Sequence, residues 1–312
     1  MAAAAVVAVV AELKAKSDHN DRVGIGWRGE LAAAIFSHLD RIDLLELIAD
    51  DHFRATPRVL RALRTLASHT PITLHGVAMG LAGSEPTQAR RIDNMARLVD
   101  GLQPQSWSEH LAFVRAGGVE IGHLAAPPRT VQNVDAAIAN VERATRIVGS
   151  APQLENIATL INPPASKLDE ATWVNDIIIG SGANLLIDLH NLYANAVNFG
   201  IEPADLLLRF PLHRAKAVHL SGGKWIPEPV LDGVLPSAAP RFRLLDDHIH
   251  DVPDAVFDLL TLLAQHAPQR LDVIIERDGD YPDFACLLAQ LDRARLALQR
   301  GRLAANALRR AA

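Results

Sequence analysis

The sequence predicts an α/β protein built as one (β/α)8 barrel of the TIM type. Short apolar runs rich in valine, isoleucine and leucine alternate with longer segments of helical period along the 312 residues. This alternation requires parallel strands joined by helical crossovers, and eight repeats close naturally into a barrel. An open doubly wound sheet is the second interpretation. It is disfavoured because the VGIGWRGE segment around the first strand has no glycine-rich phosphate loop.

Eight apolar runs are the expected strands. In chain order they are Val23–Ile25, Leu44–Ile48, Ile72–His75, Ser106–Glu109, Gln153–Asn156, Asn184–Asp188, Ala215–His219 and Val273–Glu276. Seven segments between or after them are expected helices, some with a start signal such as Thr56 before Pro57. These are Pro57–Ser68, Pro86–Asp100, Val131–Val148, Glu170–Gly180, Pro203–Arg209, Asp254–Gln265 and Pro282–Arg300. Two long loops, 115–129 and 221–252, follow strand ends and are expected to cover the barrel mouth.

The composition indicates one catalytic domain over residues 21–312, preceded by an alanine-rich helical extension over residues 1–20. Hydrophobic residues make up 49% of the chain, which is enough for a large core. The extension has no basic residues ahead of its apolar run, and that run is too short to span a bilayer, so we expect neither a targeting signal nor a membrane partner. The net charge is −5, with no basic stripe interleaved with aromatics, which disfavours nucleic acid as a partner.

A single cysteine, Cys286, excludes an intramolecular disulfide and fits a cytoplasmic location. Because it lies in an apolar helical run, we expect it to be a buried small hydrophobe. The most basic stretch is the C-terminal helix, where six arginines predict a solvated face and a frayed tail. They are Arg293, Arg295, Arg300, Arg302, Arg309 and Arg310.

Residues that can bind a metal ion stand at the ends of most expected strands. They are His75, Glu109, Glu155, Asp188, His219 and Glu276, and the loop after His219 adds Asp246, His248 and His250. The carboxyl ends of barrel strands open onto one mouth, so these side chains are expected to converge there. Carboxylates that end apolar runs would be costly to bury without a compensating charge, and bound cations resolve that cost.

Because successive strand residues face opposite sides, alternation limits which candidate side chains can face the barrel axis at three places. Only one of Glu109 and His110 faces the barrel axis, and we expect Glu109 to do so. If the segment after Leu245 is extended, Asp246, His248 and His250 share one face, although His250 fits an ordinary loop histidine equally well. His190 shares a face with Asp188 and is either a ligand or a group that orients the carboxylate. Histidine and carboxylate ligands without thiolate suit iron, manganese or zinc, and their number predicts two or more ions bridged by carboxylates.

Eight short motifs make the sequence resemble a known family. They are GIGWR, LHGVAMGLAG, SEHLAF, LENIA, LLIDLHNLYANAVNFG, VHLSGG, DDHIHDVPDAVFDLL and IERDGDYPDF. In this order they are similar to the motifs of the multinuclear non-haem iron-dependent oxidative enzymes, which include the oxidases of methanobactin biosynthesis. The resemblance covers roughly residues 22–298 and indicates a divergent branch.

The resemblance implies a xylose-isomerase-like TIM barrel that holds two or three iron ions. It implies that O2 is the co-substrate and that a precursor peptide, often at cysteine, is the substrate, with a small partner protein that presents the leader peptide. The implied metal ligands are His75, Glu109, Glu155, Asp188, His219, Asp246, His248 and Glu276. Asn156 and Asn191 match positions close to the metals or the substrate. We expect Asp246, His250 and Asn191 to take part in catalysis.

Two positions depart from the family's motifs. Ile48 stands where the family carries a histidine in the second strand, and Gly223 replaces the second histidine of an HLAGH motif. Either two irons are bound instead of three, or Asp50 or His52 compensates. The alternatives to the oxidase are a metal-dependent sugar isomerase or endonuclease-like hydrolase, and a non-catalytic scaffold. A lysine beside the metals would favour the isomerase, and Lys224 is the candidate.

Overall fold

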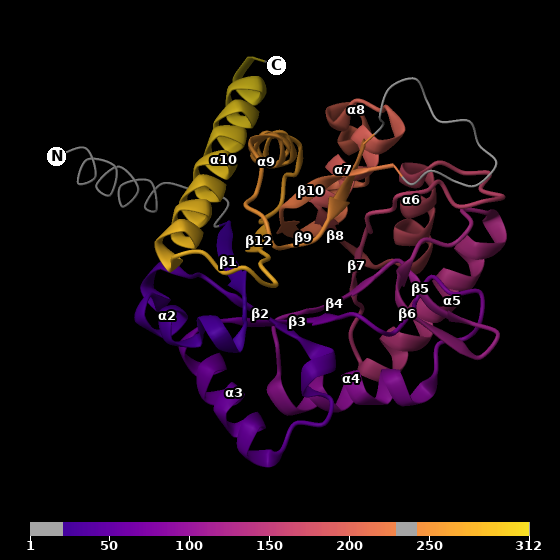
Figure 1. Cartoon of the computed structure of the whole chain (residues 1–312), viewed down its shortest axis with the longest axis horizontal. Helices are drawn as coiled ribbons and strands as arrows, with labels where there is room; N and C mark the ends of the chain where they lie inside the picture. The colour runs from indigo at the N-terminus through magenta and orange to yellow at the C-terminus, as the bar shows by residue number, and fades with distance from the viewer. Residues whose placement is uncertain (1–20, 229–241, 312) are drawn as a thin grey trace.

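A computed structural model describes residues 21–228 and 242–311, and it shows a closed barrel with helices around it (Figure 1). Eight parallel strands form the barrel in the order β1-β12-β9-β8-β7-β4-β3-β2. Their bounds are Arg22–Gly26 for β1, Leu45–Ile48 for β2, Ile72–Gly76 for β3, Trp107–His110 for β4, Gln153–Glu155 for β7, Asn184–Asp188 for β8, Ala215–Leu220 for β9 and Asp272–Ile275 for β12. The predicted TIM barrel and its eight strands are confirmed. The expected N-terminal helix lies outside the described residues.

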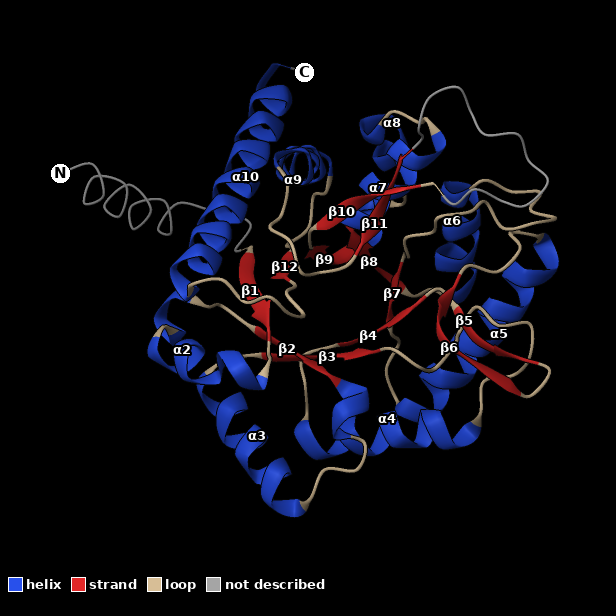
Figure 2. Ribbon diagram, viewed as in Figure 1, coloured by secondary structure: helices blue, strands red, loops and turns tan. Residues whose placement is uncertain are grey.

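The helices lie outside the ring of strands, as the blue ribbons of Figure 2 show. They are α2 (Ala32–Ser37), α3 (Pro57–His69), α4 (Ala89–Leu102), α5 (Val131–Val148), α6 (Glu170–Ser181), α7 (Leu189–Phe199), α8 (Pro203–Leu208), α9 (Asp254–His266) and α10 (Phe284–Ala311). All seven predicted helices are present, and α2 and α7 are additional. The prediction missed α7 because it begins directly after β8, where Asp188 caps it by accepting the Asn191 N–H at 2.6 Å.

Each of the two long loops contains an antiparallel hairpin. The first pairs β5 (Phe113–Ala116) with β6 (Val119–Ala125), and the second pairs β10 (Gly223–Pro227) with β11 (Phe242–Asp246). The second hairpin lies against α7, where the Asn198 side chain bonds both backbone groups of Leu244, at 2.7 and 2.9 Å. Four short 3-10 helices complete the described elements: Gly29–Leu31, Leu39–Arg41, Ala49–His52 and Leu212–Arg214.

The two ends of the barrel sequence meet where β1 pairs with β12. Arg22 forms an ion pair with Asp272 at 2.6 Å across this seam. The last helix, α10, continues past the predicted end at Arg300 and packs against α9 and β1. Arg302 is buried and bonds Asp21 at 2.7 Å, so the prediction of a solvated arginine there is wrong. The reason is that this face of α10 packs beside the starts of β1 and β12, where Arg302 also bonds the Gln269 carbonyl.

Cys286 is exposed on α10, which contradicts the expectation that it is buried. The apolar run of FACLLAQL faces the barrel through Leu287, Leu288 and Leu291, and the cysteine lies off that stripe. Among the described residues, no helix is both long and apolar enough to cross a membrane.

Candidate metal centre

Histidine and carboxylate side chains from six barrel strands and the residue after β12 meet inside the mouth. Successive strand residues face opposite sides, and residues paired in parallel register share a side. His110 pairs with Glu155, and Asp188 pairs with His219, so all four face inward. Three overlapping groups have ligand atoms within 4.8 Å of one another: Glu46, His75 and His219; His75, His110 and Glu155; and Glu155, Asp188, His219 and Glu276.

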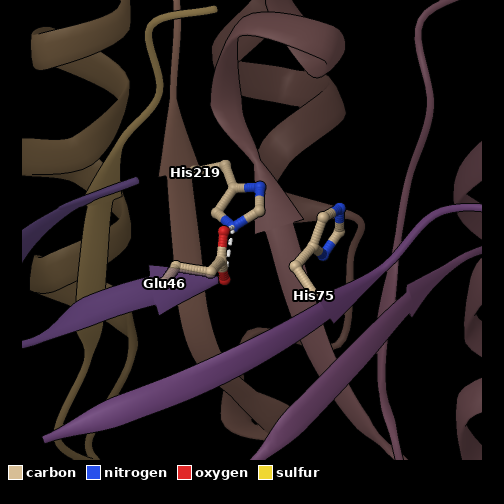
Figure 3. A group of neighbouring side chains, drawn as sticks. All are labelled: Glu46, His75 and His219. Atoms are coloured by element: carbon tan, nitrogen blue, oxygen red, sulfur yellow. Dashed lines mark hydrogen bonds and ion pairs between the residues drawn. The ribbon is translucent and has the colours of Figure 1, made fainter. Parts of the chain in front are cut away.

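The first group joins β2, β3 and β9, as Figure 3 shows. The Nε2 atom of His219 lies 3.0 Å from Oε1 of Glu46, and the rings of His75 and His219 are 5.1 Å apart. Burial raises the pKa of Glu46, although the neighbouring imidazole opposes this. Burial and the nearby imidazoles of His110 and His219 lower the pKa of His75 well below its ordinary value, which leaves a neutral ring able to bind a cation.

Glu155 connects the other two groups. Its Oε2 atom lies 3.4 Å from Nε2 of His75 and 3.3 Å from Nε2 of His110, and its Oε1 atom lies 3.2 Å from Nδ1 of His219. Burial alone would lower the pKa of His110, but the carboxylates of Glu155 and Glu109 raise it to about 9. The carboxylate therefore belongs to both the second and the third group.

Three buried carboxylate oxygens of this cluster accept no hydrogen bond: Glu155 Oε2, Asp188 Oδ2 and Glu276 Oε2. Buried polar atoms normally have partners, so these atoms indicate a missing positive charge. Ligands of one ion with bonds of about 2.1 Å lie roughly 3.0 to 3.4 Å apart in octahedral or tetrahedral geometry. The observed separations of 3.2 to 3.4 Å fall in this range. The donors present therefore fit cations with mixed nitrogen and oxygen coordination, such as iron, manganese or zinc.

Asp246 and His248 lie beside the third group. Nε2 of His248 is 2.7 Å from Oδ2 of Asp246, and its Nδ1 is 3.7 Å from Oε2 of Glu276. Asp278 accepts from His248 Nδ1 at 3.1 Å and from Arg28 Nε at 2.9 Å. Burial raises the pKa of Asp278, but the imidazole and the guanidinium outweigh this and lower it to about 2. This ionised carboxylate orients the imidazole of His248.

His190 holds the other oxygen of the Asp246 carboxylate. Its Nδ1 atom lies 2.7 Å from Oδ1 of Asp246, and the Ser221 hydroxyl donates to the same oxygen at 3.0 Å. Gly223 leaves room for this ring, because a Cβ there would lie 2.6 Å from Cε1 of His190. Thus His190 orients a carboxylate, as one of the two expectations held, but that carboxylate is Asp246 and not Asp188.

The structure brings His110, and not Glu109, into the cluster. Glu109 pairs in register with Gly76 and faces outward, toward Met95 on α4. Its carboxylate accepts the backbone N–H groups of Met79 and His110 at 3.2 and 3.0 Å. The missing side chain at Gly76 provides the space for it. The expectation that Glu109 faces the barrel axis is therefore wrong, and Glu109 contacts the cluster only through His110.

His250 does not reach the cluster either. The chain turns after β11, and His248 adopts a left-handed backbone with φ of 56°, so the alternation of an extended strand fails. The imidazole of His250 bonds Asp247 at 2.9 Å, and its side chain is 45% exposed. The structure thus separates His250 from Asp246 and His248.

The two asparagines have different surroundings. The Asn156 amide bonds both backbone groups of Asp188, at 3.0 and 2.9 Å, and so fixes the end of β8. Asn191 donates to the Asn156 carbonyl at 3.1 Å, and its Oδ1 atom is buried without a partner at the edge of the cavity described next. Its amide oxygen is therefore free to contact a substrate or a cation.

A cavity of about 220 Å³ opens over the second and third groups. Its floor contains His110, Glu155, Asn191, Asp246 and His248. Its walls are largely apolar and come from three segments: β6, the loop after β7, and β11. The apolar wall residues include Leu124, Ile157, Leu160 and Leu244.

The sequence profile of the RiPP precursor modification enzyme family MbnB/TglH/ChrH matches residues 22–299. The chain belongs to this family. Its relatives include a UPF0276 protein of Streptomyces avermitilis, 34% identical over 89% of this chain and 55% of the relative. A second is a UPF0276 protein of Bordetella bronchiseptica, 31% identical over 90% of this chain and 93% of the relative. The chain thus spans about half of the Streptomyces relative and nearly all of the Bordetella one.

Solved structures similar to the barrel are sugar epimerases of the xylose-isomerase-like fold. D-Psicose 3-epimerase from Clostridium cellulolyticum H10 aligns with a TM-score of 0.54 at 12% identity, over 91% of this chain and 99% of that chain. An L-ribulose 3-epimerase aligns with a TM-score of 0.55 at 16% identity, over 92% and 98%. At these identities the likeness shows the fold alone, and it confirms the predicted xylose-isomerase-like barrel.

The two departures from the family's motifs have structural counterparts. Ile48 pairs in register with His75, and Glu46 stands two residues earlier on the same inward face. Glu46 is a site residue that the strand-end search missed, although a glutamate inside the apolar run LLELI carries the same signal. Neither Asp50 nor His52 joins the three groups. Asp50 instead accepts the Val77 N–H at 2.9 Å.

Proposed function

We propose that this protein is an iron-dependent oxidase that uses O2 to modify residues of a ribosomally made precursor peptide, with cysteine as the expected residue. The observation that supports this most strongly is the convergence of three overlapping histidine and carboxylate groups, with three buried oxygens that lack hydrogen bonds. Membership of a family of precursor-modifying enzymes supports the peptide as substrate.

The proposed ligands of two or three irons are the members of the three groups together with Asp246 and His248. Iron bound there would supply the redox chemistry with O2. The single cysteine of the chain is exposed on α10, so no thiol of the protein stands at the cluster to share this work. The residues of the centre would hold the ions: Glu155 belongs to the second and third groups, and His190 and Asp278 hold Asp246 and His248 in position.

The cavity supports a peptide substrate over a sugar. A sugar presents hydroxyl groups that need donors and acceptors on most sides, whereas the cavity walls are largely leucine and isoleucine. Lys224 was the candidate for isomerase chemistry, but its Nζ atom lies 3.8 Å from Asp247 and the side chain is half exposed. This position of Lys224 does not favour the isomerase. We also propose that a small partner protein presents the leader peptide, as the family resemblance implies.

The test is metal analysis of protein purified without oxygen, followed by oxygen uptake with a precursor peptide encoded beside the gene. Two to three irons per chain and peptide-dependent oxygen consumption with a change in peptide mass are expected. Stoichiometric zinc or manganese alone, with turnover of a sugar or phosphodiester, would contradict the oxidase. The variant Glu170→Gln, which alters a partly buried glutamate outside the three groups, should keep the iron content of the wild type.

A further inference from the structure

The cavity over the metal centre is too small for a whole substrate of moderate size. Its volume of about 220 Å³ is below the roughly 300 to 1,000 Å³ of common small-molecule pockets. It suits one side chain whose parent molecule continues outside. The surface next to the opening therefore decides what surrounds the residue that enters.

The wall formed by Leu244 continues onto one face of the β10–β11 hairpin. Leu244 is paired with Trp225, and Phe242 is paired with Pro227. Paired residues and alternate residues of a hairpin share a face, so Leu244, Trp225 and Phe242 lie on one side. Leu244 is buried in the wall, whereas Trp225 and Phe242 are 53% and 51% exposed.

Exposed aromatic side chains are rare in this protein, and two of them stand together here. Of the 14 tryptophan, tyrosine and phenylalanine residues, all of which lie in the described part, only Phe36, Trp225 and Phe242 are exposed. Two aromatics beside a functional cavity are typical of a recognition surface. Another wall residue, Leu160, is followed by Ile161, which is 66% exposed.

The lysine and arginine of the hairpin have partners outside the cavity lining. Lys224 lies near Asp247, and Arg243 pairs with Glu228 at 2.8 Å and lies over the Phe199 ring. No lysine or arginine lines the cavity among the described residues. The rim of the opening thus offers apolar contacts and no lysine or arginine to select an acidic ligand.

A second copy of the chain fits this surface poorly. Two aromatic side chains bury at most about 500 Å². A stable dimer buries about 800 Å² on each partner. A short peptide strand needs only such a small surface.

We propose that the Trp225–Phe242 face binds apolar residues that flank the reacting residue of the peptide, and so selects for an apolar sequence around it. This rests on the proposed function for the peptide class. Beyond that function, the proposal names a preference for apolar residues beside the reacting residue, and it assigns this preference to Trp225 and Phe242. The reacting side chain enters the cavity toward His110, Glu155 and Asp246, while its neighbours in the peptide pack on the indole and phenyl rings.

The test uses two fluorescein-labelled heptapeptides with a central cysteine. One has leucine and phenylalanine on both sides of the cysteine, and the other has serine and asparagine. Anisotropy is measured with iron-loaded full-length protein under anaerobic conditions. We expect the apolar peptide to bind at least about tenfold more tightly. The double variant Trp225→Ser/Phe242→Ser should remove that preference, while Phe36→Ser, the third exposed aromatic, should retain it.

Iron content and elution volume are measured for each variant, so that loss of the metal centre or of a dimer is seen directly. Equal affinity for the two peptides, no binding of either up to millimolar concentration, or a preference that survives in the double variant would overturn the proposal. A dimer lost in the double variant while the peptide preference persists would also overturn it. If the preference holds but no peptide is oxidised in oxygen, the proposed function fails while the binding surface stands.

Discussion

Replacing Glu155 with glutamine tests whether one carboxylate serves two metal positions. Glutamine keeps the shape of the side chain, but it removes the charge and converts one oxygen into a donor. Because Glu155 belongs to the second and third groups, Glu155→Gln should lower the metal content of both. A variant in one group alone, such as Glu276→Gln, should affect fewer ions.

The contact between Glu155 and His110 gives the size of the effect that Glu155→Gln should have on the pKa of His110. The two groups lie 3.3 Å apart, and an effective dielectric of 20 gives an attraction of about 5 kcal/mol. The rise in the pKa of His110 from 6.5 to about 9, reached against the opposing effect of burial, is worth about 3 kcal/mol. These values agree in order of magnitude, so the charge of Glu155 is sufficient to account for the rise. Without it, the pKa of His110 should fall back toward or below its ordinary range.

The same interaction makes the stability of the metal-free protein depend on pH. A histidine whose pKa is raised by folding stabilises the folded state fully below the unfolded pKa, and this contribution is lost as the pH rises through the folded pKa. Wild-type apoprotein should therefore lose up to about 3 kcal/mol of unfolding free energy from His110 between pH 6.5 and about 9. Glu155→Gln should lose much less over that interval.

The assay combines histidine NMR titration of chelator-treated protein with denaturant unfolding at both ends of this pH interval. Metal per chain is measured after anaerobic reloading. Glu170→Gln alters a partly buried glutamate that accepts from Asn195 outside the three groups, and it serves as the matched control. A His110 resonance that still titrates near pH 9 in Glu155→Gln, or full metal content in that variant, would refute the reasoning.

Three further predictions concern the same centre. Asp188→Asn should stabilise the metal-free protein by about 1 to 2 kcal/mol, because burial and then Asp246 and Glu155 raise the pKa of Asp188 while an amide still caps α7. Calorimetry should show the gain to be larger at pH 8 than at pH 5, and a destabilised apoprotein would contradict it. His248→Asn should lower metal content and oxygen consumption, whereas His250→Asn should leave both near wild type, because only His248 contacts Asp246 and Glu276. Competition with a chelator should show that His190→Phe lowers the affinity for one ion by about 10- to 100-fold, since phenylalanine fills the space but cannot bond Asp246; an unchanged affinity would assign His190 a packing role only.

The strands and most residues of the histidine and carboxylate cluster could be predicted from the sequence because both depend on local rules. An apolar run that ends in a carboxylate indicates a buried strand with a compensated charge, and this identified Glu155, Asp188 and Glu276. Glu46 carries the same signal, but it stands in the middle of its run, and a search restricted to strand ends passes over it.

The remaining site residues depend on register and loop geometry, which the local pattern does not contain. Glu109 and His110 are adjacent, and the choice between them is made by Gly76 on the neighbouring strand, which leaves an outward space for Glu109. His250 was grouped with Asp246 and His248 on the assumption of an extended segment, and the left-handed backbone at His248 breaks that assumption. The two hairpin segments contain apolar residues, as in FVRA and FRLLD, but they fall outside the alternation of barrel strands and helices, so the pattern predicts loops there.

His219 is contacted by residues from opposite ends of the barrel sequence. Glu46, in the second strand, lies 3.0 Å from one of its nitrogens, and Glu276, just after the last strand, lies 3.2 Å from the other. A nascent chain that has not yet reached Glu276 therefore cannot assemble this environment, and uptake of an ion by the group that contains Glu276 has to wait for synthesis of the final strand. At a free concentration of 1,000 times its dissociation constant, such an ion would add about 4 kcal/mol to the free energy of unfolding. It would thereby join residues from the first and last quarters of the polypeptide.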